Sequence, residues 1–547
     1  MLARRVVRLS KAFGAACLLL LSACSPASQS RTAGDTLRLT TGADPPGLNP
    51  LVFDNAEVTY ASPLIHGFLL TTDAEGRLVP DFALEVPTRA NGGISADGRT
   101  ITYRLRRGVT WQDGAPFDAR DVAFTIRAVL NPANDVPDRT GFDDIDGVRV
   151  PNPHTVLVRL KRPFSPFVAS CLTLGANDPY PILPAHLLAG RHDLNHDPYN
   201  EKPVGLGPYA LASWQRGSRL ELVANAHYYR GPPGFKRVTI AIVPDQSTTL
   251  ALFKTGDVDV VVARSATGRA YLDAVRGVPG THTILKPHNE FDFVIFNTAR
   301  APLDDVRVRR ALVLGIDRER IMRSIEGELW VPGDSDRLPG KFGYDAALRQ
   351  PRYDPAAAAR ELDAAGWRLV DGVRVRSGRR LVLDAVSTTE STATTRFDVL
   401  LQQDLKRLGI ITNLKAYTYD IMWAAADQGG INKTGRFDLE DSGWDPGSID
   451  DHSYLFRCQD RPPNGDNFAG ICDPVIEAAA REELDSTDPL RQAAGDRAIT
   501  RRLVDRSDVL FLGFTRDGVG VRNDVTGVAP SITGMHLWNV WAWRRRR

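Results

Sequence analysis

Strand-like and helix-like segments alternate over hundreds of residues of this chain, and this alternation limits the folds that it can adopt. Strands are expected at Thr36–Thr41, Arg237–Ile242, Val258–Val262, Phe291–Asn297, Leu381–Val386 and Ile410–Tyr417. Helices are expected at Ala119–Leu130, Asp245–Thr255, Asp305–Leu314, Asp317–Glu326, Thr395–Leu408 and Pro474–Leu484. The pattern is typical of α/β lobes and not of a sandwich or a helical bundle. The 547 residues suffice for about two or three domains, and no long low-complexity linker separates them.

Two of the helices have clear signals at their ends. Asp118 is placed to cap the helix that follows it, and Asp121 favours the positive end of the helix dipole. Asp354 and Pro355 begin an alanine-rich helix, and Gly366 is expected as the left-handed residue that ends it.

Residues 1–23 have the composition of a secretory signal. Four basic residues precede an apolar run, Ala12–Leu21, which is shorter than the roughly 20 residues needed to span a bilayer. Ser22, Ala23 and Cys24 follow, and Leu21–Cys24 resembles a bacterial lipobox. We therefore expect lipidation at Cys24 and a flexible tether over residues 24–34, the alternative being an ordinary signal peptide with a chance cysteine. No other stretch approaches 18 apolar residues, so no transmembrane helix is expected.

The net charge argues against nucleic acid as a partner. The formal charge is +2, and removal of the leader with its four basic residues leaves −2. Such a nearly neutral chain has no electrostatic basis for binding phosphate backbones. The exception is Arg544–Arg547, which is interpreted as a solvated tail, with contact to anionic lipid as the alternative.

Three cysteines remain after the leader and Cys24 are set aside, and three pairings are possible. Cys458 and Cys472 flank a short polar loop, which a disulfide would stabilise by about 3 kcal/mol. Cys171 lies among apolar residues and is interpreted as a small buried side chain. The Cys458–Cys472 pair is therefore the preferred one.

The chain lacks the motifs of the common catalytic sites. It contains no G-x-S-x-G elbow and no phosphate-binding G-x-x-x-x-G-K-[ST] loop. His192 and His196 have the spacing of metal ligands on a helix, but Pro198 and Asn195 favour a polar loop. No enzymatic activity, cofactor or metal is expected.

The segment Asp438–Asp451 combines many carboxylates with one tryptophan. It is interpreted as a strand that leads into an acidic loop. Such a loop can meet a cationic or amine-bearing ligand, with the indole providing apolar or cation–π contact. A solvated turn with a core tryptophan is the equally weighted alternative.

Several segments together resemble the family 5 extracellular solute-binding proteins, the peptide-binding lipoproteins of ABC importers. The resemblance covers nearly all of the chain after the leader. The matching segments, in order, are Tyr103–Gly114, Phe117–Val122, Pro203–Tyr209, Thr255–Val260, Asp305–Leu312 and Ile316–Arg318.

The resemblance implies a two-lobed α/β fold with a hinge and a ligand cleft between the lobes. Lobe I would comprise residues 35–286 and 514–547, and lobe II residues 287–513. Ligand would bind between the lobes and stabilise a closed state, which the membrane permease would recognise.

The resemblance also implies positions for the ligand site. Asp54, Asn55 and Ala56 would form an extended segment that pairs with ligand, and Trp423, Gly443 and Trp444 would line the pocket. Peptide binders place an aspartate three residues after this second tryptophan, where the present chain has Gly447. An amine partner would then be Asp441 or Asp445, or the ligand is a nickel chelate, opine, sugar or other solute. Some dipeptide-binding relatives have a disulfide at the place of Cys458 and Cys472.

The function expected from these observations is that of a monomeric, lipid-anchored receptor outside the cytoplasm. It would capture a peptide or a similar polar solute and deliver it to an ABC permease with its ATPase subunits. A signalling receptor with the same fold is the first alternative, and an extracellular enzyme on this scaffold is the second.

Overall fold

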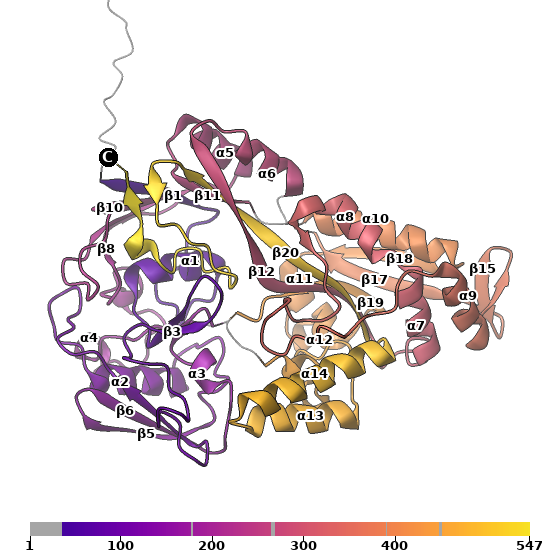
Figure 1. The fold of residues 1–547 in the computed structure, drawn as a ribbon, viewed down its shortest axis with the longest axis horizontal. Helices are drawn as coiled ribbons and strands as arrows, with labels where there is room; N and C mark the ends of the chain where they lie inside the picture. The colour runs from indigo at the N-terminus through magenta and orange to yellow at the C-terminus, as the bar shows by residue number, and fades with distance from the viewer. Residues whose placement is uncertain (1–34, 177–178, 264–267, 390, 448–450, 547) are drawn as a thin grey trace, which may run out of the picture.

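Two long antiparallel strands run through the centre of the molecule and connect its two halves (Figure 1). They are β12 (Thr281–Phe296) and β20 (Val509–Arg522). Their ladder is irregular at two places, between Pro287 and Phe291 and between Asp292 and Phe293. The structure is a computed structural model that describes residues 35–546 except 177–178, 264–267, 390 and 448–450.

The half at the left of Figure 1 is built mainly from the N-terminal part of the chain and contains small sheets. One has the strand order β1 (Thr36–Thr41), β10 (Arg237–Ile242), β9 (Arg219–Ala224) and β8 (Tyr209–Gln215), with β1 and β10 parallel. Two others have the orders β4 (Thr100–Arg104), β6 (Thr155–Leu160), β5 (Ile145–Asn152) and β3 (Leu78–Pro80), β2 (Leu70–Thr72), β7 (Thr173–Leu174). A C-terminal pair, β21 (Val525–Thr526) and β22 (Arg544–Arg545), returns to this half.

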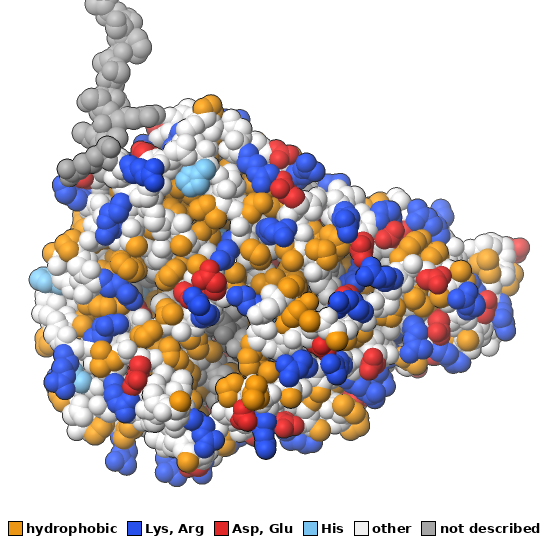
Figure 2. Space-filling view, in the orientation of Figure 1, with side chains coloured by type: hydrophobic (Ala, Val, Ile, Leu, Met, Phe, Trp, Pro, Cys, Tyr) orange, Lys and Arg blue, Asp and Glu red, His pale blue; other side chains and the backbone are white. Residues whose placement is uncertain are grey.

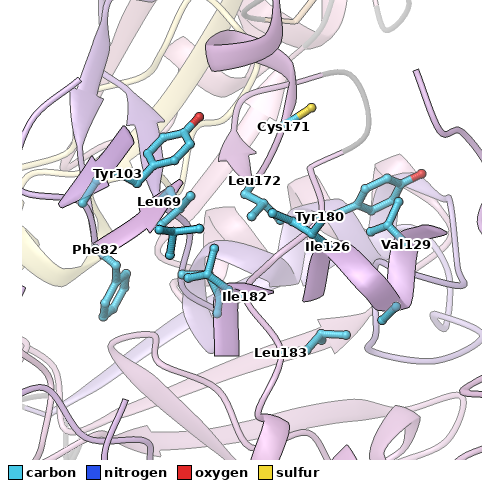
Figure 3. Close-up of a cluster of buried hydrophobic side chains, with 14 of the residues drawn as sticks. Leu69, Phe82, Tyr103, Ile126, Val129, Cys171, Leu172, Tyr180, Ile182 and Leu183 are labelled. Atoms are coloured by element: carbon cyan, nitrogen blue, oxygen red, sulfur yellow. The ribbon is translucent and has the colours of Figure 1, made fainter. Parts of the chain in front are cut away.

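A large apolar core lies inside this half, and Figure 3 shows part of it. Helix α2 (Ala119–Leu130) contributes Val122, Ile126 and Val129, which recur at helical spacing and are buried. Cys171 lies in the same core and is a free, buried thiol, as the sequence predicted.

The half at the right of Figure 1 extends the two long strands into a seven-stranded sheet. Its order is β11 (Val260–Ala263), β20, β12, β19 (Leu439–Trp444), β17 (Val382–Thr388) and β18 (Ile411–Tyr417), with β13 (Trp330–Val331) beside β20. Strand β17 is parallel to both β18 and β19, and the other pairs are antiparallel. A small sheet of β14 (Arg368–Val370), β15 (Val373–Arg376) and β16 (Arg379–Arg380) lies at the far end.

Helices cover the sheets of both halves (Figure 1). Besides α2, the structure has α1 (Ala56–Ile65), α3 (Phe167–Ser170), α4 (Ala185–Leu188), α5 (Gln246–Thr255), α6 (Gly268–Arg276), α7 (Val306–Gly315), α8 (Arg318–Ile325), α9 (Pro355–Ala364), α10 (Thr392–Arg407), α11 (Tyr419–Trp423), α12 (Ile431–Thr434), α13 (Pro474–Asp485) and α14 (Pro489–Arg506). Within the described part of the chain, no helix combines the length and apolar character required to cross a bilayer.

The end signals read from the sequence are confirmed. Asp118 and Asp121 form a reciprocal capping box at the start of α2. Asp354 caps α9 by accepting from Ala357, and Gly366 has a φ of +84° after its end. These interactions lie within one turn of the chain, so the sequence alone can specify them.

Strand β20 was not predicted because glycines interrupt its apolar pattern. The structure shows why they are there: a Cβ at Gly513 would lie 2.4 Å from the carbonyl oxygen of Val331, and one at Gly520 2.4 Å from Cγ1 of Val275. These glycines serve the close approach of neighbouring elements and do not end the strand.

The C-terminal arginines correct the prediction of a solvated tail. Arg544 and Arg545 form β22, and the side chain of Arg545 donates to the buried carboxylate of Asp259 at 2.9 Å. Arg38 of β1 pairs with the same carboxylate, also at 2.9 Å. The two ends of the described chain are thus held together by one buried acid, because a buried charge requires partners of opposite sign.

Cys458 and Cys472 are joined by a disulfide, with their Cα atoms 4.5 Å apart. The proposed leader, Cys24 and the tether of residues 24–34 lie outside the described residues, as does Arg547.

Candidate ligand-binding site

The sheet of the right-hand half splits where its parallel strands end. Strand β17 pairs with β19 only through Ala385–Leu439 and Val386–Glu440, whereas it stays paired with β18 as far as Thr388 and Tyr417. Beyond Glu440, β19 therefore runs without a partner on the β17 side. Ligands of open α/β sheets bind outside the carboxyl ends of such strands, and the split marks this position.

A cavity of about 280 Å³ lies at this split. Its walls come from β12, α8 and the turn after it, the β17–α10 connection, α10, α11, β19 and β20. The lining residues are Glu290, Asp292, Met322, Ile325, Glu326, Thr388, Ser391, Ala393, Thr394, Phe397, Tyr419, Trp423, Glu440, Asp441, Ser442, Gly443 and Leu512. Five of these residues are acidic, and none is Lys or Arg.

The strand register places the acids together. Asp292 lies opposite Gly443, and Asp441 lies two positions along β19, opposite Val294. Gly443 leaves room for the carboxylates, since a Cβ there would be 2.9 Å from Oε1 of Glu290 and 3.1 Å from Oδ1 of Asp292. Gly443, expected as a ligand contact, thus also sets the spacing of the acidic side chains.

The crowded carboxyl groups hold their protons more strongly than usual. Burial raises the pKa of Glu440 to about 8 and that of Glu326 to about 7. Burial and the neighbouring Asp398, Asp292 and Glu440 raise the pKa of Asp441 well above its ordinary value. The pKa of Asp292 is also raised, first by burial and then by Glu290 and Glu326. Burial and the neighbouring carboxylates in this cavity disfavour ionisation of each acid.

Aromatic side chains form one wall beside the acids. The ring centroid of Trp423 lies 5.7 Å from that of Tyr419 and 5.8 Å from that of Trp444. The indole of Trp444 donates to the hydroxyl of Tyr454 at 2.7 Å. Trp423 faces the acidic cavity, and Trp444 faces a second pocket on the other side of the pair.

The second pocket lies between the two halves and has a volume of about 470 Å³. The N-terminal half contributes Asp138, Thr140, Phe142, Phe164, Ser170, Ala176 and Tyr180. The other half contributes Lys433, Trp444, Asp451, Tyr454, Arg457, Asp460, Asn464, Gly465 and Asp466. The two pockets adjoin along β19, where Gly443 lines the first and Trp444 the second.

Asp54 and Asn55 lie directly before helix α1, and the backbone of Asn55 is extended, with a φ of −152° and a ψ of 161°. Asn55 caps α1 by accepting the N–H of Val58 at 3.0 Å, and Ala56 is the first helical residue. Asp54 still faces the opposite half, because its charge raises the pKa of Tyr419 in addition to the effect of burial.

Asp445, one of two candidate amine partners, lines neither pocket. Its carboxylate lies 3.3 Å from Nε2 of His288 and accepts the N–H of Gly447 at 2.9 Å. Asp441, the other candidate, lines the acidic cavity. The structure thus brings Trp423, Asp441 and Gly443 to one cavity and directs Asp445 to a histidine.

Three acidic cavity residues, Glu290, Asp292 and Glu326, were not identified from the sequence, whereas Glu440 belongs to the acidic segment Asp438–Asp451 that was. A signal for two of them exists, since Glu290 and Asp292 alternate with Phe291 and Phe293 in one strand. Such alternation places two carboxylates on the face opposite the apolar core. Among the residues that the structure describes, no three His, Cys, Asp or Glu side chains form a group that could hold a metal ion, and His192 lies in a loop beside Asp193.

Comparison with known proteins agrees with this architecture. The model of the bacterial extracellular solute-binding proteins, family 5 (middle), matches residues 77–466. The chain is 28% identical over 488 residues to protein XP55 of Streptomyces lividans, covering 88% of this chain and 83% of that protein. It is 25% identical to the nickel-binding periplasmic protein of Escherichia coli strain K12, covering 91% and 92% of the two chains.

Solved structures share the fold over nearly the whole chain. NikA from Brucella suis, in complex with Fe(III)-EDTA, matches with a TM-score of 0.81 at 21% identity, covering 93% of this chain and all of that one. AppA from Bacillus subtilis, in complex with a nonapeptide, matches with a TM-score of 0.76 at 20% identity, covering 94% and 99%. The two-part α/β arrangement is therefore the fold of these binding proteins.

Proposed function

Since the chain belongs to the bacterial extracellular solute-binding proteins of family 5, we propose that it is a lipid-anchored receptor that captures a peptide or similar polar solute for an ABC importer. Proteins of this family are transport receptors without catalytic activity. The relatives named above include a nickel-binding protein and an oligopeptide-binding protein whose structure was solved with a nonapeptide. The ligand of the present chain is proposed from its own pockets.

The observation that carries this proposal is the pocket between the two halves and its junction with the acidic cavity. Residues from both halves line the former, so a solute there touches both at once. Such a solute binds the closed arrangement of the two halves more tightly than the open one, and this difference in affinity stabilises the closed arrangement. The acidic cavity lies on the other side of the Trp423–Trp444 pair.

The lobe boundary fits the irregular part of the central ladder. We assign residues 35–286 and 514–547 to lobe I and residues 287–513 to lobe II. The chain then passes between the lobes at two places where the pairing of β12 with β20 shifts, between Pro287 and Phe291 and near Gly513. A bulged ladder bends more easily than a regular one, so this place is suited to be the hinge.

The lipid anchor is proposed from the N-terminal sequence alone. The receptor would start at Cys24 and be held to the membrane near its permease by its acyl chains. Residues 24–34 then provide the length between membrane and lobe I.

The test is to identify what the purified protein carries and whether that ligand closes it. Native mass spectrometry of the protein should reveal a co-purified small solute. Small-angle scattering should then show a smaller radius of gyration with that solute than after its removal. Scattering curves that coincide in the two states would contradict a receptor that closes on its ligand.

A further inference from the structure

We propose that the acidic cavity at the end of β19 binds the positively charged end of an organic solute, an ammonium or guanidinium group on an alkyl chain. The inference rests on the proposed receptor function and adds the class of ligand. It goes beyond a general polar solute, because it makes positive charge a requirement for tight binding.

The first observation is the one-sided charge of the cavity. Five carboxyl groups line it, and no lysine or arginine does. The exterior is different, since Figure 2 shows basic and acidic side chains interspersed over the face in view. Two positive groups that act on these acids also have other partners. Nδ1 of His288 lies 3.5 Å from Glu290, but its ring also faces Asp445 and Asp517. Arg396, whose charge acts on Glu326, donates to the carbonyl of Ser324.

The second observation is that two of these acids are buried with an oxygen left over. Glu440 is 2% exposed, and its Oε1 accepts from Nδ2 of Asn432 at 3.0 Å, while its Oε2 has no hydrogen-bond partner among the residues that the structure describes. Glu326 is 4% exposed, and its Oε2 also has none. A buried carboxyl oxygen without a partner is costly, so a donor from the ligand would relieve a penalty that is already present.

The third observation is the apolar part of the lining. Phe397, Met322, Ile325 and Leu512 lie along the cavity with Tyr419 and Trp423. Such walls suit the methylene stem of a lysine- or arginine-like group, and the aromatic faces attract its cation. The volume of about 280 Å³ lies just below the roughly 300–1,000 Å³ of whole-ligand pockets, as expected for a subsite that holds one end of a solute.

An organic cation accounts for the geometry better than a metal ion. In the described part of the chain, no group of His, Cys, Asp and Glu has the convergence that a metal requires. Carboxylates spread along a cavity instead match a planar or multi-donor group that presents several N–H bonds. The same chemistry occurs in a basic side chain of a peptide and in a free diamine or guanidino-amine.

Calorimetric titration of the purified protein tests the proposal with four probes. They are the tripeptide Ala-Arg-Ala, its neutral isostere Ala-citrulline-Ala, agmatine, and Ni²⁺ alone. We expect at least one of the two guanidinium probes to bind, and Ala-Arg-Ala to bind at least tenfold more tightly than the citrulline peptide if the source is a peptide. Agmatine binding as tightly as the peptide would instead identify a free amine as the source.

Two variants locate the binding. Glu440→Gln and Asp441→Asn should each weaken guanidinium binding at least tenfold, whereas Glu482→Gln, an exposed acid on α13, should leave it unchanged. Melting temperatures within a few degrees of the parent protein would show that the variants are folded. Equal affinity for the arginine and citrulline peptides, binding unchanged in both cavity variants, no binding of either guanidinium probe, or Ni²⁺ binding lost in Glu440→Gln would each overturn the proposal.

Failure of this inference is distinguishable from failure of the receptor function. If the citrulline peptide binds as tightly as the arginine peptide and still compacts the protein in scattering, the receptor function stands and the charge requirement does not.

Discussion

His288 and Asp445 face each other across the end of the ligand region, with Nε2 of the imidazole 3.3 Å from the carboxylate. His288 is 4% exposed and lies at the bend of β12, between the acidic cavity and β20. Its contacts with Asp445, Glu290 and Asp517 link β19, the cavity and the central ladder. The carboxylate of Asp445 is therefore a structural partner in this arrangement.

Asp445→Asn should lower stability more than ligand affinity. Burial alone would lower the pKa of His288, but Asp445, Asp517 and Glu290 raise it to about 9. Because the pKa of His288 is higher in the folded protein, its contribution to folding stability is complete below about pH 6.5, its pKa in the unfolded chain. This contribution is lost as the pH rises through 9. In urea unfolding, the free energy of unfolding should fall by about 1–2 kcal/mol at pH 6 and by less at pH 10. The figure at pH 6 is kept low because Asp445 is partly exposed to solvent.

The matched control for that variant is Asp485→Asn, an exposed acid on α13. Equal losses at pH 6 and pH 10 would argue against an imidazolium–carboxylate pair.

Gly443→Ala should weaken binding while the protein stays folded. The added Cβ would lie 2.9 Å from Oε1 of Glu290 and 3.1 Å from Oδ1 of Asp292, so both carboxylates must move. We expect a three- to tenfold loss of affinity for the ligand that co-purifies with the protein, measured by calorimetry. Gly42→Ala is the control, because nothing lies within 4 Å of a Cβ there. An affinity unaffected by Gly443→Ala would show that Gly443 does not shape the ligand site.

Binding of a cation should release protons near neutral pH. The pKa of Glu440 is about 8 and that of Glu326 about 7 in the empty cavity, both above the ordinary 4.5, mainly through burial. A bound cation favours the ionised forms, so affinity should rise between pH 6 and pH 8. The charged groups around these two acids are Glu290, Asp292, Arg396, Asp398 and Asp441.

The same shifts set the stability of the empty protein. Since the folded-state pKa values are raised, the empty protein should lose stability as the pH rises from about 4.5 to about 8, and ligand should restore it. Calorimetry in two buffers of different ionisation enthalpy measures the protons released. Identical heats in both buffers at pH 7 would mean that no acid changes its protonation on binding.

Arg545→Ala should destabilise the protein, although only two residues follow Arg545 in the sequence. Its guanidinium is 2.9 Å from Asp259, which is completely buried, and its loss leaves only Arg38 to balance that charge. We expect a loss of about 2 kcal/mol in denaturant unfolding, because an incompletely paired buried acid is costly. Arg546→Ala, an exposed neighbour, should change little. If both variants changed the free energy of unfolding equally, the ion pair of Arg545 with Asp259 would not contribute to stability, as expected for a solvated tail.

Cys24→Ser should release a folded and active receptor. Cys24 is the proposed site of lipid attachment, so we expect only membrane attachment to change. Cell fractionation should find the variant in the soluble extracytoplasmic fraction with unchanged ligand affinity. Retention in the membrane fraction would contradict lipidation at Cys24.

The helix ends and several strands follow from the sequence because they depend on neighbours within a few residues. Asp118 and Asp354 act on backbone N–H groups of the next turn, and β1 and β10 have the predicted bounds. The family could be identified for a similar reason, since its motifs are short segments in a fixed order. The resemblance that rests on this order implied a ligand site at Gly443, Trp423 and Asp441, and all three line the acidic cavity.

The sequence by itself determined the α/β class, the family, the capped helices and a choice between Asp441 and Asp445. Only the tertiary structure places Asp441 at the cavity and Asp445 beside His288, and only it assembles the cavity. The strand register places Asp292 opposite Gly443, and Glu326 lies at the end of α8. The carboxylate of Asp445 lies beside His288 and does not line the cavity. The physical reason is that electrostatic interaction depends on distance and burial in space, and residues far apart in the chain acquire both only when the sheets and helices pack.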